Sequence, residues 1–177
     1  REGWINADNT KKPQAKNYPI TFMDATEPWP YENNVFDYVL SEHMIEHVPA
    51  NKGLAMLKEA HRCMKLGAII RVSCPNRTFF EALPGKDDHP FVHAYAQKIF
   101  KRPAVSGDAK RIADRTLNEQ GHVWVPSVAT LIQQLQKAGF KNVKPVVYGS
   151  SEHEVFNGIE VNDGVRNWES AVVEGEK

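Results

Sequence analysis

The first half of the chain alternates short β-prone runs with a stretch of helical periodicity. Four β-prone runs can be distinguished: Trp4–Ala7, Pro19–Met23, Phe36–Leu40 and Ala68–Cys74. Pro75 stops the last of them. Between the third and the fourth, apolar residues recur at helical spacing over 51–65, and Gly67 then offers the left-handed conformation that ends helices. This alternation predicts an α/β fold with a parallel sheet covered by helices on both faces.

The second half has a weaker pattern at its start. Apolar periodicity fades over 79–121, where prolines and glycines recur. We expect an insertion or lid over a site there, or a loop-rich flank. Beyond it, Ser127 is placed to cap a helix with one apolar stripe, which Gly139 ends. Two β-prone runs, 144–148 and 170–174, follow. We expect residues 1–177 to form a single domain with a single core.

Composition narrows the classes of partner. Lys plus Arg and Asp plus Glu each number 22, so the chain lacks the net positive charge typical of bulk phosphate binding, which disfavours a nucleic-acid partner. The most apolar stretch, 66–74, is interrupted by Arg71 and is shorter than the roughly 20 residues of a membrane span. The first residues lack the apolar run of a signal peptide. With only Cys63 and Cys74 as thiols, the sequence predicts a cytoplasmic protein without a disulfide framework.

Polar residues follow three of the β-prone runs. Asp8 and Asp24 end the first two, and Ser41, Glu42 and His43 follow the third. Ligands of open α/β sheets bind outside the carboxyl ends of the strands. One carboxylate there can accept hydrogen bonds from both hydroxyls of a ribose, and another can accept a hydrogen bond from the amine of an adenine. The pair therefore suits a nucleoside, although either aspartate alone is equally compatible with a turn or helix cap.

The order and spacing of several segments resemble the predicted methyltransferases of the type 11 group, which are class I S-adenosylmethionine-dependent methyltransferases. The segments are Gly3–Asp8, Asp24–Ala25, Trp29–Tyr31, Phe36–Tyr38, Ser41–His47, Leu57–Arg62, Lys65–Gly67, Gly121–Trp124, Ala138–Phe140 and Glu169–Glu174. The resemblance implies a Rossmann-like, doubly wound, mostly parallel sheet. It also implies an enzyme that binds S-adenosyl-L-methionine at the carboxyl edge of that sheet and transfers its methyl group.

The resemblance assigns cofactor contacts by position. Asp8 matches the acid that binds the ribose hydroxyls, and Asp24 with Ala25 matches the pair beside the adenine. Ser41 and Glu42 match the strand end that lines the methionine portion. No metal ligand is implied.

The same resemblance places His43 at the mouth where the methyl group is transferred. His43 is thus the first candidate for a general base, and His122, beside Trp124, is the second. The acceptor is expected to be a small molecule or a glycan-like compound, in a pocket shaped by 79–121. The sequence of that segment does not identify the acceptor.

Two departures from the family pattern bear on the sheet. Lys65–Ala68 replaces the Lys-Pro-Gly-Gly turn, and the first, central strand with its Gly-x-Gly loop should precede Gly3. The sequence therefore suggests an N-terminally truncated domain with weak or absent cofactor binding. Backbone groups of 4–7 and 36–40 would then lack a neighbour. We expect these two segments either to pair directly or to receive a strand from a second chain, as in a homodimer that completes the sheet.

Three alternatives remain open. The segment His43–His47, with Glu46, also fits the H-x-x-E-H pattern of inverted zinc proteases, which would make the chain a zinc-dependent hydrolase. That motif needs both histidines on one continuous helix, whereas this segment begins at a strand end, so we expect His43 and His47 not to share a metal. A nicotinamide dehydrogenase shares the fold class but also needs a glycine loop. A catalytically inactive binding module is the third alternative.

Overall fold

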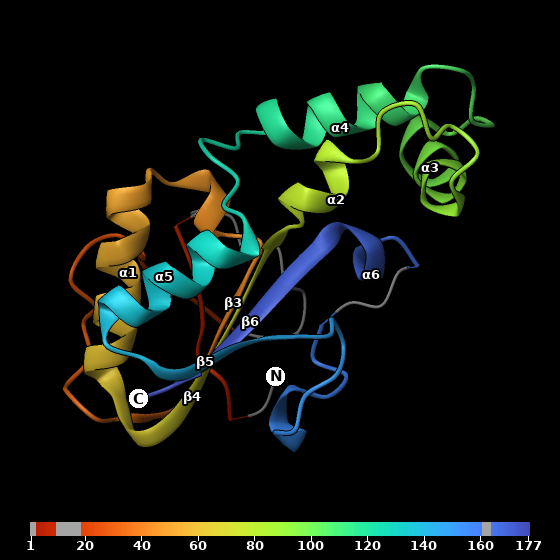
Figure 1. Cartoon of the computed structure of the whole chain (residues 1–177). Helices are drawn as coiled ribbons and strands as arrows, with labels where there is room; N and C mark the ends of the chain where they lie inside the picture. The colour runs from red at the N-terminus through yellow and green to blue at the C-terminus, as the bar shows by residue number, and fades with distance from the viewer. Residues whose placement is uncertain (1–2, 10–18, 161–163) are drawn as a thin grey trace.

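The computed structural model describes residues 3–9, 19–160 and 164–177 of the chain (Figure 1). The strands are β1 Asn6–Asp8, β2 Ile20–Phe22, β3 Phe36–Glu42, β4 Met64–Pro75, β5 Lys141–Val146 and β6 Ser170–Glu176. The α-helices are α1 Ala50–Cys63, α2 Arg77–Glu81, α3 Pro90–Tyr95, α4 Asp108–Asn118, α5 Val128–Ala138 and α6 Arg166–Glu169. Short turns of other helix types are η1 Ile45–His47, η2 Ala96–Phe100 and η3 Glu154–Phe156.

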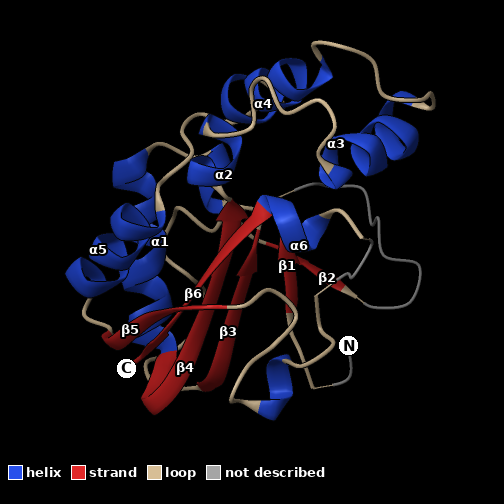
Figure 2. Ribbon diagram, turned by 45° about the vertical axis from the view of Figure 1, so that its right-hand side comes forward, coloured by secondary structure: helices blue, strands red, loops and turns tan. Residues whose placement is uncertain are grey.

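The strands form two sheets. The larger one has the order β3-β4-β6-β5, with β3 parallel to β4 and with β6 antiparallel to both of its neighbours. The smaller one pairs β1 with β2 in parallel and lies beyond β3 (Figure 2). The predicted α/β class and the parallel pairing of the early strands are thus confirmed, with antiparallel strands added at one side of the larger sheet.

A cleft separates the two sheets. Strands β1 and β3 are not hydrogen-bonded neighbours, so the expectation that 4–7 and 36–40 pair directly is wrong for this chain. Side chains make the connection instead. The ring of Phe156 lies 6.3 Å from that of Trp4 and 5.6 Å from that of Tyr38, centre to centre. Because Phe156 is fully buried, apolar packing rather than a backbone ladder joins the two sheets there.

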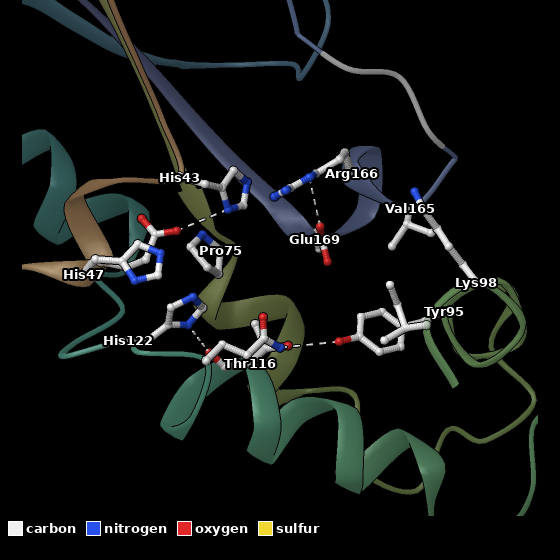
Figure 3. Close-up of a pocket in the computed structure, with 13 residues that line it drawn as sticks. His43, His47, Pro75, Tyr95, Lys98, Thr116, His122, Val165, Arg166 and Glu169 are labelled. Atoms are coloured by element: carbon white, nitrogen blue, oxygen red, sulfur yellow. Dashed lines mark hydrogen bonds and ion pairs between the residues drawn. The ribbon is translucent and has the colours of Figure 1, made fainter. Parts of the chain in front are cut away.

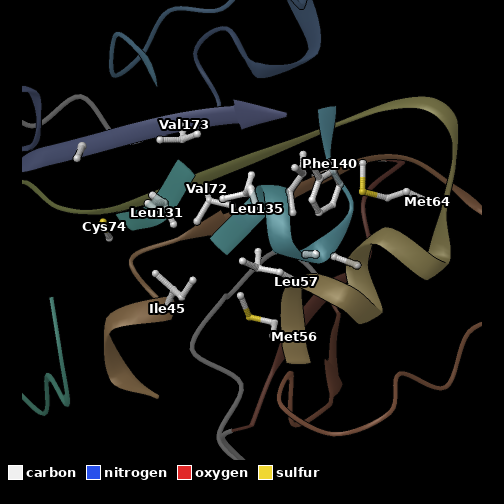
Figure 4. Packing of buried hydrophobic residues seen from close by; sticks show 14 of the residues in the cluster. Ile45, Met56, Leu57, Met64, Val72, Cys74, Leu131, Leu135, Phe140 and Val173 are labelled. Carbon is white, nitrogen blue, oxygen red and sulfur yellow. The ribbon is translucent and has the colours of Figure 1, made fainter. Parts of the chain in front are cut away.

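The main core lies between the larger sheet and the helices α1 and α5, which pack on each other (Figure 4). Side chains alternate between the faces of a strand, and on β4 this places Ile70, Val72 and Cys74 in the core. They are all buried, as are Leu57 of α1 and Leu131 of α5. The apolar run of β4 therefore forms the floor on which both helices pack.

The helix bounds follow local chemistry. Ser127 caps α5 by accepting a hydrogen bond from the backbone N–H of Thr130, and Gly139 ends it at φ +111°, both as predicted. Helix α1 ends at Cys63 rather than at Lys65, because the chain already enters β4 at Met64.

A second core, absent from the sequence-based expectation, forms within 77–118. Helices α2, α3 and α4 bury Phe80, Phe91 and Ile112 among themselves, so this part is neither loop-rich nor without a core of its own. The prolines and glycines stand between these short helices or, in the case of Pro90, at the start of one, so no single stretch was long enough to show a helical period. The helices lie beyond the carboxyl ends of β3 and β4 (Figure 1). In the described part of the chain, no helix has the length and apolar content needed to cross a bilayer.

The opposite face of the larger sheet carries a buried ion network. Arg71 of β4 is fully buried and lies 2.8 Å from a carboxylate oxygen of Glu160 and 2.6 Å from one of Glu174. Its guanidinium also donates to the backbone carbonyls of Val147 and Ser150. The residue that interrupts the apolar run in the sequence thus fastens the segment after β5 to the sheet.

Candidate functional site

Two cavities meet at the carboxyl end of β3. The first, here called the inter-sheet cleft, has a volume of about 820 Å³ and lies between β1 and β3. Its lining includes Ala7, Ala25, Trp29, Tyr31, Tyr38, Ser41, Glu42 and Met44. The second, here called the histidine pocket, has a volume of about 290 Å³. It lies between that strand end and the helices η2, α4 and α6 (Figure 3), and is lined by His43, Glu46, His47, Pro75, Tyr95, Lys98, Ile99, Thr116, Gln120, His122, Val165, Arg166 and Glu169.

Three predicted cofactor contacts, Ala25, Ser41 and Glu42, line the inter-sheet cleft. The hydroxyl oxygen of Ser41 is buried and has no hydrogen-bond partner among the described residues. A carboxylate oxygen of Glu42 accepts a hydrogen bond of 3.0 Å from the hydroxyl of Tyr148. Burial, and next the charge of Glu42, raises the pKa of Tyr148, so that hydroxyl stays a donor. The hydroxyl of Ser41 therefore keeps its hydrogen-bonding capacity for a ligand.

The two predicted aspartates follow neighbouring parallel strands. Asp8 is the last residue of β1 and lies opposite Phe22, and Asp24 follows β2, so both stand at the same sheet edge as expected. Asp24 is exposed, and its Oδ1 accepts hydrogen bonds from the backbone N–H and the hydroxyl of Thr26, which lower its pKa. Ala25 lines the cleft, whereas neither aspartate does. Asp24 thus caps a turn, which is the structural alternative the sequence left open.

His43 occupies a turn with an unusual backbone conformation. Its φ of +47° lies in the left-handed region, which is uncommon for a residue with a side chain and recurs at functional sites. Its backbone N–H donates to the carbonyl of Ser73 and so extends the pairing of β3 with β4. Its Nε2 lies 2.8 Å from the hydroxyl of Ser170, and its Nδ1 lies 3.2 Å from a carboxylate oxygen of Glu46. The imidazole of His43 is thus positioned by a hydrogen bond on one side and by a buried carboxyl group on the other.

His122, the second candidate base, meets a residue that was not predicted to lie near it. The rings of His122 and His47 are 4.9 Å apart, centre to centre, and Figure 3 shows them on the same side of the pocket. Backbone bonds hold the two segments together, because the carbonyl of Glu46 accepts from the N–H groups of Val123 and Trp124. Both predicted bases therefore line one pocket, on two sides of Glu46.

The H-x-x-E-H segment does not form a single helix. His43 lies in the left-handed turn before η1, and only Glu46 and His47 belong to that short 3-10 turn. The two histidines are directed to different partners: His43 contacts Ser170, whereas Nδ1 of His47 contacts the carbonyl of Gly121. The structural context of an inverted zinc protease is therefore missing.

The sequence did not single out several other lining residues. Tyr95, Thr116 and Gln120 come from α3, α4 and the turn after it, and Arg166 and Glu169 come from α6, where they lie 3.4 Å apart as an ion pair. No spacing links these positions in the sequence, because they meet only through the packing of the second core. Part of this set was anticipated from the sequence only in general terms, by the expectation that 79–121 shapes a pocket.

The comparisons with known proteins identify a family. The sequence profile of a family described as "Methyltransferase domain" matches residues 5–144. Comparison with curated proteins gave no significant match.

Solved structures share the fold. An S-adenosylmethionine-dependent methyltransferase from Archaeoglobus fulgidus superposes with a TM-score of 0.58 at 15% identity, covering 98% of this chain and 75% of the other. One from Mesorhizobium loti gives 0.56 at 15% identity, with coverage of 98% and 79%. A protein from Thermotoga maritima, described as a possible histamine N-methyltransferase, gives 0.53 at 19% identity, with coverage of 89% and 63%.

These matches support neither the hydrolase nor the inactive-module alternative. The family profile covers well over half of the chain, and the sheet carries the predicted strand ends at its carboxyl edge. The chain therefore belongs to the methyltransferase-domain family, with the Rossmann-like α/β fold of class I S-adenosylmethionine-dependent methyltransferases.

Proposed function

We propose that the chain is a methyltransferase that binds S-adenosyl-L-methionine in the inter-sheet cleft and a small acceptor in the histidine pocket. One observation carries the proposal: Glu42 and His43 are consecutive, yet the first lines the cleft and the second lines the pocket. A ligand in each cavity would meet the other at the end of β3. Group transfer between two bound molecules needs such a shared wall.

The cleft offers groups that suit the cofactor. The buried hydroxyl of Ser41 lacks a partner among the described residues, and a polar group of a bound ligand can satisfy it. Trp29 and Tyr31 add aromatic surface to the same cleft, which suits an adenine ring. Asp8, half-buried at the end of β1, is assigned to the ribose hydroxyls, and Ala25 to the adenine edge. When bound, the cofactor supplies an electrophilic methyl group on a sulfonium centre.

The histidine pocket suits a compact, polar acceptor. Its volume of about 290 Å³ is at the small end of ligand cavities, which favours a small metabolite over a macromolecule. Charged and hydroxyl groups line it, among them Lys98, Arg166, Glu169 and Tyr95. An acceptor hydroxyl or amine must lose a proton as it is methylated. We assign that proton to His43, whose position is fixed by a hydrogen bond to Ser170 and by the nearby carboxylate of Glu46.

Titration with S-adenosylhomocysteine, the spent cofactor, tests the cleft assignment. Ser41→Ala removes a hydroxyl that the described chain leaves without a partner, so it should leave unfolding stability unchanged or slightly raised. The same variant should bind the ligand up to about 10-fold more weakly, since one hydrogen bond contributes about 0.5–1.5 kcal/mol. Asp8→Asn should also weaken binding. Ser106→Ala, in an exposed turn, is the matched control.

Methyl transfer itself is tested by transfer of labelled methyl groups to a panel of small phenols, amines and carboxylic acids. Transfer to at least one acceptor, reduced up to about 10-fold in Ser41→Ala at limiting cofactor, supports the proposal. If the wild type, Ser41→Ala and Asp8→Asn bind S-adenosylhomocysteine equally well, the inter-sheet cleft is not the cofactor site. The family assignment would remain, because it rests on the fold.

A further inference from the structure

Three potential metal ligands meet at the inner wall of the histidine pocket. Glu46, His47 and His122 each offer one donor atom, and these atoms lie within 4.8 Å of one another. The first two are neighbours on η1, whereas His122 comes from the turn after α4. His122 is the ligand that the H-x-x-E-H pattern could not supply, and it takes the place that the pattern would give to His43.

Each of the two histidines has one ring nitrogen on a backbone carbonyl, which leaves the other nitrogen free for a metal ion. Nδ1 of His47 lies 3.2 Å from the backbone carbonyl of Gly121, and Nδ1 of His122 lies against the backbone carbonyl of Thr116. A carbonyl oxygen only accepts hydrogen bonds, so each Nδ1 carries the proton and each Nε2 carries the lone pair. Metal-binding histidines are commonly oriented in this way by a carbonyl on the far nitrogen. Figure 3 shows His47 and His122 side by side at the pocket.

The carboxylate of Glu46 needs a cation. Its side chain is fully buried, and neither oxygen accepts a hydrogen bond among the described residues. Nδ1 of His43 lies 3.2 Å from one oxygen, so a protonated His43 would form an ion pair with that oxygen and leave the other unsatisfied. An unpaired buried carboxylate is strongly unfavourable. A divalent ion bound to Glu46 and to one ring nitrogen of each histidine would satisfy the remaining oxygen.

We propose that Glu46, His47 and His122 bind a divalent transition-metal ion, with Zn²⁺ as the test ion. Two imidazoles and one carboxylate match zinc and its first-row neighbours, whereas Mg²⁺ and Ca²⁺ prefer oxygen ligands throughout. Bond lengths of about 2.0–2.2 Å allow two ligands of one ion to stand at most about 4.4 Å apart, so binding draws these side chains slightly inward. His47 is exposed and can make that adjustment.

The metal site would also take part in methyl transfer, an inference that rests on the proposed function. Three protein ligands leave a coordination position open toward the pocket, where an acceptor oxygen can bind. The ion lowers the pKa of such a hydroxyl, and His43 accepts the proton released from the oxygen. The oxygen lone pair then forms the bond to the methyl carbon while the carbon–sulfur bond breaks. With the metal bound, His122 is a ligand, so His43 is the remaining candidate for the general base. The preferred acceptors are phenols and enols.

The test is titration of Zn²⁺ into chelator-treated protein, followed by calorimetry and by metal analysis after gel filtration. We expect one ion per chain. Glu46→Gln, His47→Ala and His122→Ala should each weaken binding by more than the roughly 10–100-fold that loss of an outer-shell partner causes. His43→Gln should weaken it far less than these ligand variants. His93→Ala, an exposed histidine of α3, is the matched control.

Folding and function are separated by two further measurements. Circular dichroism and melting without metal identify any variant that fails to fold, and the visible absorption of bound Co²⁺ reports the ligand set in those that fold. Binding that is substoichiometric, or unchanged in His122→Ala, overturns the metal site. Zinc binding without methyl transfer to any acceptor would defeat the proposed function alone, while methyl transfer undiminished by chelator would defeat the metal's role alone.

Discussion

His47 and His122 come from distant parts of the sequence, yet their rings lie 4.9 Å apart and each turns Nδ1 toward a backbone carbonyl. The contact depends on the N–H groups of Val123 and Trp124, which donate to the carbonyl of Glu46 and so fix the turn after α4 against η1. The inner wall of the histidine pocket is thus held in place by backbone hydrogen bonds between η1 and the segment that follows α4.

Replacement of His43 tests its role as the base. His43→Gln keeps a hydrogen-bonding side chain but cannot take up a proton, so kcat for an acceptor that must lose a proton should fall about 10²–10⁴-fold. Binding of S-adenosylhomocysteine should change little, because His43 lines the histidine pocket and not the inter-sheet cleft. Steady-state kinetics beside calorimetry separates the two effects. An unchanged kcat would exclude His43 as the base.

Arg71 should be the most costly buried charge to remove. It is paired with Glu160 and Glu174 and is fully buried, so Arg71→Met leaves two buried carboxylates without their cation. We expect the free energy of unfolding, from urea titration, to fall by about 3–5 kcal/mol. Lys110→Met is the control: its ion pair with Asp114 is exposed and should contribute at most about 0.5 kcal/mol. Similar losses in the two variants would contradict this reading of the network.

The elements that could be predicted are those whose local chemistry agrees with their tertiary role. Ser127 and Gly139 bound α5 because a hydroxyl cap and a left-handed glycine act within a few residues. Strands β3 and β4 were found because their apolar runs are buried by α1 and α5. The second core was missed because α2 and α3 are too short to show a periodicity, and Phe80 and Phe91 are buried by contacts between different helices rather than along one helix face.

The site could be predicted only where one strand end supplies it. Ser41, Glu42 and His43 are contiguous, so a single strand boundary placed all of them, two in the inter-sheet cleft and one in the histidine pocket. The contact between His122 and Glu46 could not be predicted from sequence spacing, because it depends on how segments far apart in the chain pack together. Arg71 looked like an interruption of an apolar run, since its carboxylate partners lie far along the chain.

Acid should selectively weaken the start of α4. Two hydrogen bonds of 2.7 Å from Arg102 hold the carboxylate of Asp108, with a further one from the backbone N–H of Val105, and they lower its pKa to about 2. Since the folded pKa lies below the usual 3.8, the contribution to stability is complete above pH ~4 and is lost as the pH falls toward 2. The shift corresponds to about 2 kcal/mol.

The measurement is the stability difference between the wild type and Asp108→Asn at several pH values. By urea titration it should be largest near pH ~7 and should shrink steadily below pH ~4. Asp114→Asn, in an exposed pair with Lys110, should give a small difference that hardly changes. A difference for Asp108→Asn that is constant down to pH ~2.5 would mean that the ion pair with Arg102 does not stabilise the fold.

The cap of α5 should show a smaller, local effect. Ser127→Ala removes the acceptor for the backbone N–H of Thr130 and should lower the free energy of unfolding by about 1 kcal/mol. Ser127→Asp should restore most of it, because aspartate is also a good cap. Urea titration measures both. Equal stability of the alanine and aspartate variants would show that the cap contributes nothing.

The edge of β3 that faces the inter-sheet cleft should be visible in hydrogen exchange. Strand β3 pairs with β4 along one edge, and in the described ranges no strand pairs with its other edge. Backbone N–H groups alternate between the two edges of a strand, so every second amide of Phe36–Glu42 should exchange fast in dilute protein. Strand β4 is paired on both sides, with β3 and β6, and its amides over 69–73 should all be protected. Uniform protection of β3 in dilute protein would contradict the open edge. Because an unpaired edge is a template for another strand, we expect the fast amides of β3 to become protected as the concentration rises when S-adenosylhomocysteine is absent, since a strand from a second copy and the cofactor would occupy the same cleft. Exchange that stays fast at every concentration would exclude a homodimer that completes the sheet.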